Sequence, residues 1–212
     1  RLSNSELLRV DTCWSVVLGF SMVDPVRHVY FQKRHVLFAL GAGDPRRAAR
    51  ALAFEGALLT AGKGRARLHA REIMEQSKAL AERTGDPHAL GLATLWAGGA
   101  AWLRGDWKIC ADLTRQAELI FRQQCVGVAN ERVTSEVFML AALVWMGELH
   151  RHEELFPQLL QEARGRGDRY AEATLILLTY RHVLLLAADE PERAEQELGY
   201  AMSRWSQEGF HL

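Results

Sequence analysis

Glu82–Leu90 reads ERTGDPHAL, and its GDP core also occurs at Gly43–Pro45, with GD once more at Gly167–Asp168. Glycine directly after a helical run can adopt the left-handed conformation that ends a helix, whereas aspartate is a favourable N-cap for the next helix. Proline suits the first position of that next helix, where its nitrogen needs no hydrogen bond. Each of these stretches therefore predicts the end of one helix and the start of another.

Such turn residues recur at a nearly constant spacing. One series is spaced 42, 42, 40 and 42 residues apart: Gly43, Gly85, Gly127, Gly167 and Gly209. A second series is spaced 41, 42 and 42 residues apart: Gly64, Gly105, Gly147 and Asp189. Each unit of about 42 residues thus holds two segments of about 17 to 20 residues, and neither shows the alternation of a strand. This pattern predicts a repeated helical hairpin.

The expected elements follow from these turns. We expect helices over residues 3–19, 25–40, 45–61, 65–83, 87–104, 107–124, 129–147, 151–165, 169–187 and 191–208. They pair into about five antiparallel hairpins, over residues 1–42, 43–84, 85–126, 127–166 and 167–209. The predicted fold is all-α, a single helical-repeat domain over 1–212 built as an α-solenoid. Pro157 leaves one boundary open, because it either kinks the helix over 151–165 or makes that helix start later.

The two helices of a hairpin differ in charge. Leu92–Leu103 contains no charged residue, whereas the helix over 107–124 carries five charges along one side: Lys108, Asp112, Arg115, Glu118 and Arg122. The apolar stripe of that second helix has helical spacing: Trp107, Cys110, Leu113, Ala117 and Ile120. One face of the second helix is therefore expected to be wet. We expect first helices in an inner layer and second helices in an outer layer.

Composition narrows the classes of protein and partner. The 212 residues are 49% hydrophobic and 25% charged, as in a globular chain, and 26 Lys and Arg balance 26 Asp and Glu. Without a basic excess, no nucleic-acid partner is expected. Cys13, Cys110 and Cys125 are odd in number and lack metal-ligand spacing, so reduced thiols and a cytoplasmic location are expected.

No membrane span or targeting signal is expected. The apolar run Val137–Met146 is too short for a span, and Ala173–Ala188 is interrupted by Arg181 and His182. The first residues, RLSNSELLRVD, have no initiator Met and no signal-peptide pattern. We therefore expect this sequence to be a segment of a longer protein.

Leu95–Phe121, LWAGGAAWLRGDWKICADLTRQAELIF, resembles a tetratricopeptide repeat. Its GDW turn at Gly105–Trp107 and its small Gly98, Cys110 and Ala117 match that family's turn and close-packing positions. The period of about 42 departs from the roughly 34 of the family.

A second resemblance concerns the parent protein. Longer repeats, including Cys13–Leu40 and Gly43–Leu59 here, resemble the tetratricopeptide-like tails of bacterial multidomain signalling proteins. In those proteins a serine/threonine kinase and an ATP-binding ATPase domain precede the tail. The resemblance implies such a parent, and no activity for this segment.

Candidate chemistry is sparse, and we expect no catalytic residue, cofactor or metal site. Gly62–Gly64 followed by basic residues is not a P-loop, and it is expected to be an interhelical turn, with an anion site at the helix start as the alternative. His150 and His152 lie two residues apart on different sides of a helix, so a solvated helix start is expected rather than a metal site. His182 is either a ligand contact or a satisfied, partly buried histidine.

A candidate partner groove follows from the family's register, with Gly105 as the reference. The positions that line the concave face of tetratricopeptide repeats fall on apolar residues here: Leu95, Trp102, Val137, Val144, Ile176 and Val183. An apolar strip of this length indicates an interaction surface covered by flanking domains or a partner helix. The alternative is that long helices close the solenoid and bury these residues in its own core.

Two classes of function follow. The favoured one is a noncatalytic module that binds protein, either other domains of its own chain or a separate partner, and so regulates a kinase or ATPase activity elsewhere. The alternative is a small-ligand sensor of a bacterial regulator, and an all-helical enzyme is a third. A pocket with convergent polar groups and a perturbed titratable residue would favour sensor or enzyme, whereas a long open groove would favour protein binding.

Overall fold

A computed structural model describes residues 4–21 and 24–203, and within these ranges it contains eleven helices and no strand. The predicted all-α class is therefore confirmed for the described part of the chain. The helices are α1 (Asn4–Phe20), α2 (Pro25–Ala42), α3 (Pro45–Thr60), α4 (Arg65–Thr84), α5 (Pro87–Arg104), α6 (Trp107–Gln124), α7 (Ala129–Trp145), α8 (Leu149–Gly165), α9 (Arg169–Leu178), α10 (Arg181–Ala187) and α11 (Pro191–Ser203). The predicted ends at Ser3, 204–208 and Gly209 lie outside the described residues.

The Gly-Asp-Pro stretches end and start helices as predicted. Gly85 has a φ of 61° at the end of α4, and the Asp86 carboxylate accepts hydrogen bonds from the backbone N–H groups of His88 and Ala89. Pro87 is the first residue of α5. A positive φ also occurs at the other predicted turn positions: Gly43, Gly64, Gly105, Gly127, Gly147, Gly167 and Asp189. Gly64 differs from Gly85 in that it directly precedes a helix and has a ψ of −125°.

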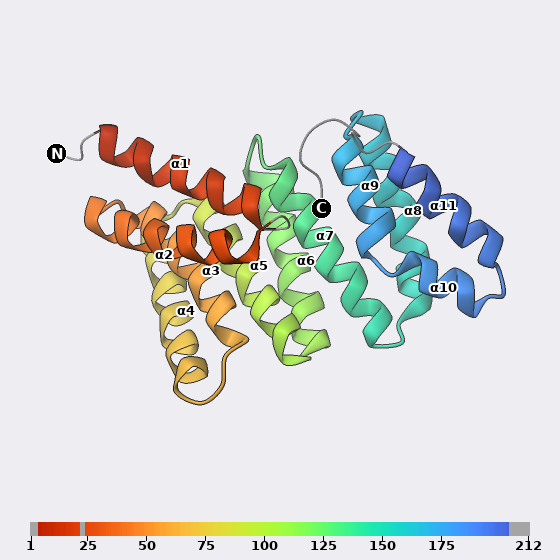
Figure 1. Cartoon of the computed structure of the whole chain (residues 1–212), viewed down its shortest axis with the longest axis horizontal. Helices are drawn as coiled ribbons and strands as arrows, with labels where there is room; N and C mark the ends of the chain where they lie inside the picture. The colour runs from red at the N-terminus through yellow and green to blue at the C-terminus, as the bar shows by residue number, and fades with distance from the viewer. Residues whose placement is uncertain (1–3, 22–23, 204–212) are drawn as a thin grey trace.

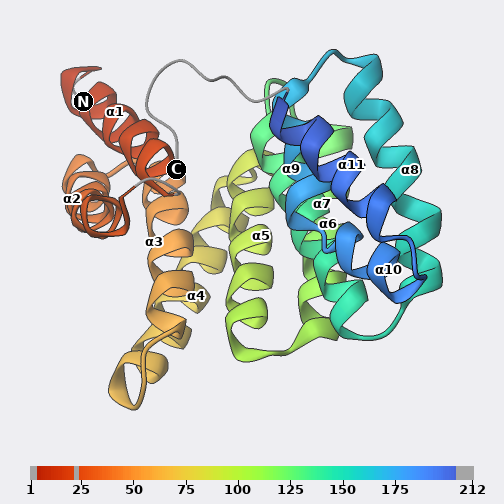
Figure 2. The same ribbon diagram turned by 45° about the vertical axis from the view of Figure 1, so that its right-hand side comes forward.

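The helices form an elongated row (Figure 1). Helices α3, α5, α7 and α9 contact one another in chain order, while α4 packs along α3 and α6 packs along α5. Helices α1 and α2 lie at one end of the row, and α8 to α11 lie at the other (Figures 1 and 2). Helix α7 packs against both α6 and α8, and more extensively on α6. Helices α6 and α8 do not pack extensively on one another, so space remains between the sides that face each other.

Small residues allow the closest helix contacts. A Cβ atom on Gly98 of α5 would lie 2.5 Å from Cγ2 of Thr114 on α6, which is too close for real atoms. A Cβ on Gly91 would collide with the ring of Phe121 on the same helix pair. Further along the row, the core is built from large side chains of α7, α8 and α9, including Leu140, Phe156 and Leu175. Helix spacing therefore differs along the row.

The predicted helix over 169–187 is wrong, because the chain breaks after Leu178 into α9 and α10, which are bent by 45°. Tyr180 has a φ of 60°, an uncommon conformation for a residue with a side chain. The break leaves the carbonyl of buried Thr179 without a helical donor, and Nε2 of His152 on α8 donates a hydrogen bond to it at 3.1 Å. A residue distant in sequence thus supplies the hydrogen bond that the Thr179 carbonyl loses at the break.

The open boundary at Pro157 is also decided. Helix α8 begins at Leu149 and continues through Pro157, so the later start is not observed. Proline removes the hydrogen bond to the carbonyl four residues earlier, on Glu153. Both residues are exposed, so water can reach that carbonyl.

Among the described helices none alone is long and apolar enough to cross a bilayer, and only the bent pair α9–α10 passes that test of length and composition.

Replacing Gly85 with alanine should destabilise the fold by about 1–2 kcal/mol, because a side chain disfavours the left-handed conformation. No atom lies within 4 Å of the added Cβ, so the effect is conformational and not steric. The matched control is Gly199→Ala inside α11, where the Cβ also meets nothing within 4 Å and the stability should rise by about 0.5–1 kcal/mol. Urea unfolding measures both, and equal midpoints would contradict the assignment of Gly85 as a helix-ending residue.

Candidate functional site

The six predicted groove residues do not form one surface. Leu95 and Ile176 are buried in the core, at 1% and 2% exposure. Trp102, Val137 and Val144 are half-buried. Val183 is 43% exposed and lies on α10, beyond the break that the sequence did not predict. The strip therefore divides into core positions and partly accessible positions.

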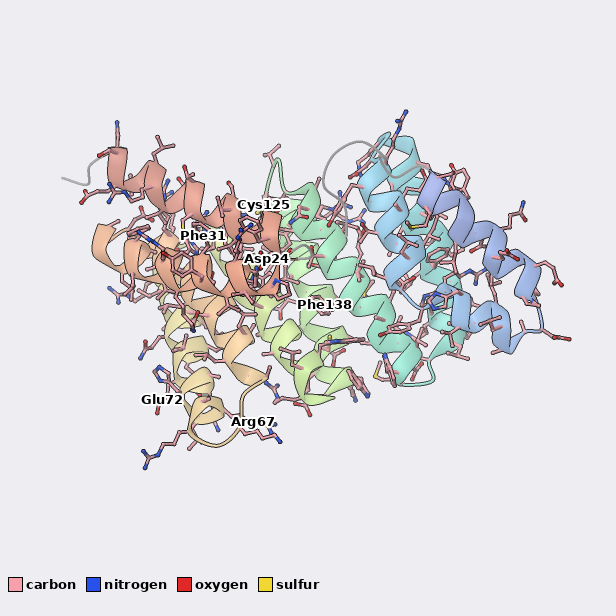
Figure 3. All side chains as sticks on the ribbon, in the orientation of Figure 1. Asp24, Phe31, Arg67, Glu72, Cys125 and Phe138 are labelled. Atoms are coloured by element: carbon pink, nitrogen blue, oxygen red, sulfur yellow. The ribbon has the colours of Figure 1, made fainter. Side chains whose placement is uncertain are left out.

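Trp102 belongs to a closed ring of four aromatic side chains. Its ring centroid lies 4.9 Å from that of Trp107, which stacks on Trp145 at 5.4 Å. Tyr180 completes the ring, with centroids 5.8 Å from Trp145 and 6.4 Å from Trp102. Phe138, labelled in Figure 3, also packs against Trp102 at 5.8 Å. This aromatic cluster ties the α5–α6 turn to the end of α7 and to the α9–α10 break.

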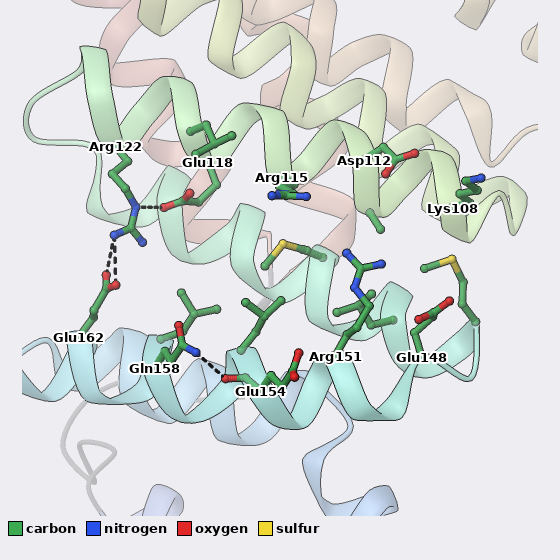
Figure 4. A pocket seen from close by; sticks show the side chains of 17 residues that line it. Lys108, Asp112, Arg115, Glu118, Arg122, Glu148, Arg151, Glu154, Gln158 and Glu162 are labelled. Carbon is green, nitrogen blue, oxygen red and sulfur yellow. Dashed lines mark hydrogen bonds and ion pairs between the residues drawn. The ribbon is translucent and has the colours of Figure 1, made fainter.

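A groove with a cavity volume of about 570 Å³ lies between α6 and α8 (Figure 4). Its floor is apolar and comes mainly from α7, through Met139, Leu143 and Met146. Its α6 wall contains the five residues that sequence analysis placed on a wet face: Lys108, Asp112, Arg115, Glu118 and Arg122. We call this site the α6–α8 groove.

Almost every charged residue of the α6 wall faces a residue of opposite charge on the α8 wall. Figure 4 shows the facing order, from the end nearest the aromatic cluster: Lys108 and Glu148, Asp112 and Arg151, Arg115 and Glu154, Glu118 and Gln158, Arg122 and Glu162. Only the last of these facing pairs has an ion pair recorded across the groove, with Arg122 Nη1 3.0 Å from Glu162 Oε2. The groove is therefore bridged at one end and open along the rest of its length.

The bridged end is a cluster of two arginines and three glutamates. Arg122 and Arg132 each lie within ion-pair distance of Glu118, Glu136 and Glu162. Glu136 is 1% exposed, and burial raises its pKa to about 7, although the neighbouring arginines oppose this shift. The nearby arginines instead hold the pKa of Glu162 below its usual value against the effect of burial. The cluster joins α6, α7 and α8.

The other residues considered from sequence serve structural roles or lie in turns. His152 is fully buried, so the expectation of a solvated helix start is wrong for this residue. Burial lowers its pKa to about 4, and the neutral ring donates to Thr179. His150 is exposed beside Glu154, and half-buried His182 has no partner recorded for Nδ1. Gly62–Gly64 joins α3 to α4 as an exposed turn.

The described residues contain no group of three or more His, Cys, Asp or Glu that could hold a metal ion. Cys13, Cys110 and Cys125 are free thiols, and burial raises the pKa of Cys110 to about 12. The Cys110 thiol is therefore protonated at neutral pH, and burial also raises the pKa of the Cys13 and Cys125 thiols.

No protein-family model matches this chain, and no curated protein is significantly similar to it. The resemblance to tetratricopeptide repeats and to kinase-linked tails therefore stays a prediction. Over residues 4–21 and 24–203, the geometry defines an all-helical fold with a charged groove between α6 and α8.

Sequence analysis found one wall of the groove and missed the other. The α8 wall carries charges or amides at 148, 151, 154, 158 and 162, a spacing that follows one helix face. The α8 wall could therefore have been predicted from this spacing. The burial of Glu136 could not have been predicted, because nothing in its local sequence distinguishes it from the exposed glutamates.

Truncation should separate core from surface among the six predicted positions. Leu95→Ala and Ile176→Ala should each cost about 2–5 kcal/mol, because both remove buried side chains. Val183→Ala should change stability by less than about 0.5 kcal/mol, since its side chain is exposed. Thermal unfolding measures the three, and a large loss with Val183→Ala would contradict the break at Tyr180.

Glu136 should make the fold less stable as pH rises. Its pKa is raised from 4.5 to about 7 in the fold, so the stabilisation is complete below pH 4.5 and is lost as pH rises through 7. The contribution of Glu136 to the free energy of unfolding should therefore fall by up to roughly 3 kcal/mol across this range, while buried His35 and His152, whose pKa values are lowered to about 3 and about 4, contribute a slope of opposite sign. Glu136→Gln should therefore gain stability relative to the wild type on going from pH 5 to pH 8 in urea titrations, whereas the exposed control Glu154→Gln should show the wild-type difference between the two pH values.

Proposed function

We propose that this chain is a noncatalytic α-solenoid module that binds protein, and that its binding site is the α6–α8 groove. The observation that carries this proposal is the pair of facing, oppositely charged walls that remain mostly unbridged above an apolar floor. Side chains of a bound segment can complete both rows of charge while its apolar face covers Leu119, which is 41% exposed, and half-buried Met146. The occupant is an amphipathic helix with charges of both signs along its flanks.

The dimensions support a helical segment as the occupant. Each wall contributes residues over about four helical turns, 108–122 on α6 and 148–162 on α8, which corresponds to roughly 21 Å. A small-molecule site is usually lined by mostly apolar side chains with few polar groups. Here charged and amide side chains outnumber the apolar ones. The raised pKa of Glu136 does not favour a sensor, because Glu136 stands behind the lining and not in it.

The identity of the parent protein rests on the resemblance described above. We propose a bacterial signalling protein in which this cytoplasmic module is attached to a serine/threonine kinase and an ATPase domain. The bound helix then belongs either to those domains or to a separate protein. Occupancy of the groove bridges the third and fourth predicted hairpins, and this is how binding can be transmitted along the row of helices.

A photocrosslinking residue in place of Leu119, which lines the groove and is partly exposed, should capture the bound segment in the full-length protein. The same residue in place of Val126, which lies in the α6–α7 turn and is 99% exposed, is the control and should capture nothing specific. Mass spectrometry of the adduct should identify an amphipathic helix.

Charge swaps then distinguish binding from a structural role of the walls. Arg115→Glu alone places like charges across the groove, and adding Glu154→Arg restores opposite charges with reversed positions. If the walls bind a partner, the single and the double variant both lose the cross-link. A double variant that cross-links like the wild type, or a Leu119 position that captures nothing, would overturn the proposal.

The small-ligand alternative is supported by a different cavity. A volume of about 930 Å³ lies between α4 and the α5–α6 hairpin, lined by apolar Met74, Leu90 and Leu113 and also by charged Arg71, Lys78 and Glu82. This volume lies within the range of small-molecule sites. A sensor would bind a metabolite-sized compound there, detected as a rise in melting temperature that Ala97→Met abolishes by filling the cavity.

A further inference from the structure

The polarity of α2 is reversed relative to that of an ordinary surface helix, whose apolar side faces the core. Three polar side chains of α2 are buried, and hydrogen bonds hold them there. His28 Nδ1 lies 2.9 Å from the carbonyl oxygen of Val17, and Gln32 Nε2 donates to the carbonyl of Ala51 at 3.0 Å. His35 Nδ1 lies 3.3 Å from Gln32 Oε1. Rotating α2 would break the bonds of His28 to Val17 on α1 and of Gln32 to Ala51 on α3, so its orientation is fixed.

The opposite side of α2 presents large apolar residues to solvent. They follow one face of the helix over nearly its whole length: Val26, Tyr30, Leu37 and Leu40. Val26 is 80% exposed and Leu37 is 69% exposed. Single exposed apolar residues are normal, but several on one face of one helix mark an interaction surface. This face lies at the end of the row, where no other described helix covers it (Figure 1).

A groove with a volume of about 690 Å³ adjoins this face, between α1 and α2. Phe31, labelled in Figure 3, and Phe38 lie in it and are half-buried. Arg9 of α1 and Arg34 of α2 both stand over the Phe38 ring, at 5.5 and 5.3 Å from its centroid. None of the described residues that line the groove is acidic. We call the combined area the α1–α2 surface, made of Leu8, Arg9, Tyr30, Arg34, Leu37 and Phe38.

We propose that the α1–α2 surface binds an acidic amphipathic helix of another protein segment. Apolar side chains of that helix cover Leu37 and enter the groove above Phe38, while its flanking carboxylates pair with Arg9 and Arg34. This surface is separate from the α6–α8 groove, and the proposal stands whether or not that groove binds a partner.

Charge decides between this occupant and a second copy of the chain. In a two-fold dimer the same patch meets itself, so two copies each of Arg9 and Arg34 would gather in one contact whose described lining holds no acidic residue. An acidic partner instead supplies the carboxylates that the lining lacks.

Shape decides between a helix and an anionic membrane. A bilayer surface can cover the exposed Leu37, but it cannot follow the recessed groove down to half-buried Phe31 and Phe38. A helix has ridges of side chains that fit between two neighbouring helices. The aromatic floor with its two arginines is therefore matched to a helix.

The test is a selection of displayed helices of about 18 residues, the length of α2, on the full 212-residue chain. Leucines are fixed at i, i+3, i+4 and i+7, and the flanking positions vary among Glu, Gln and Lys. We expect enrichment of Glu. Selected helices should bind Arg9→Glu/Arg34→Glu at least roughly tenfold more weakly, and Lys-flanked helices should now bind that variant better. Arg71→Glu on α4, an exposed arginine outside this surface, is the matched control and should leave binding unchanged.

Three outcomes would overturn the proposal. The first is a selection without preference for Glu, or binders that the double variant does not weaken. The second is a dimer of the free chain in sedimentation experiments that Leu37→Glu dissociates, which would assign the surface to a second copy. The third is binding to phosphatidylserine vesicles that the double variant abolishes, which would assign it to a lipid surface. Circular dichroism of each variant confirms that the helices remain folded.

Discussion

The spacing between helices depends on where glycine and alanine face a neighbouring helix. Gly56 of α3 admits Met74 of α4, and Gly91 and Gly98 of α5 admit Phe121 and Thr114 of α6. A single added methyl group at any of these glycines would meet an atom of the partner helix. These contacts set the distance within the α3–α4 and α5–α6 pairs, and they leave the rest of each helix free to carry charge on its outer side.

Where large side chains replace the small ones, the row opens. Helix α7 uses small Ala142 against Cys110 and Ala111 of α6, but it meets α8 through Leu143, Phe156 and Leu159. Helix α8 consequently stands away from α6, and the two charged faces look at each other across a gap. The ion cluster around Glu136 limits this opening at one end. The groove is thus a product of the side-chain volume between α7 and α8.

Local sequence rules predicted much of this arrangement. Gly85-Asp86-Pro87 contains its own stop and start signals, and the charges of 107–124 repeat at helical spacing, so both were readable without a structure. The break at Tyr180 was not, because it has neither glycine nor proline and depends on a hydrogen bond from His152, 27 residues earlier in the chain. That break also explains why the register that placed Val183 beside Ile176 failed. The reversed polarity of α2 escaped prediction for a similar reason, since the partners of Gln32 and His28 come from neighbouring helices.

The aromatic cluster gives this protein an internal optical reporter. Trp102, Trp107 and Trp145 come from three different helices, and their indole rings are close enough for their electronic transitions to couple. Coupled indoles produce a characteristic near-ultraviolet circular dichroism signal that depends on mutual orientation. Trp107 and Trp145 directly precede Lys108 and Met146, which line the α6–α8 groove. A change in the separation of α6 and α7 at this end would therefore alter the spectrum without any added label.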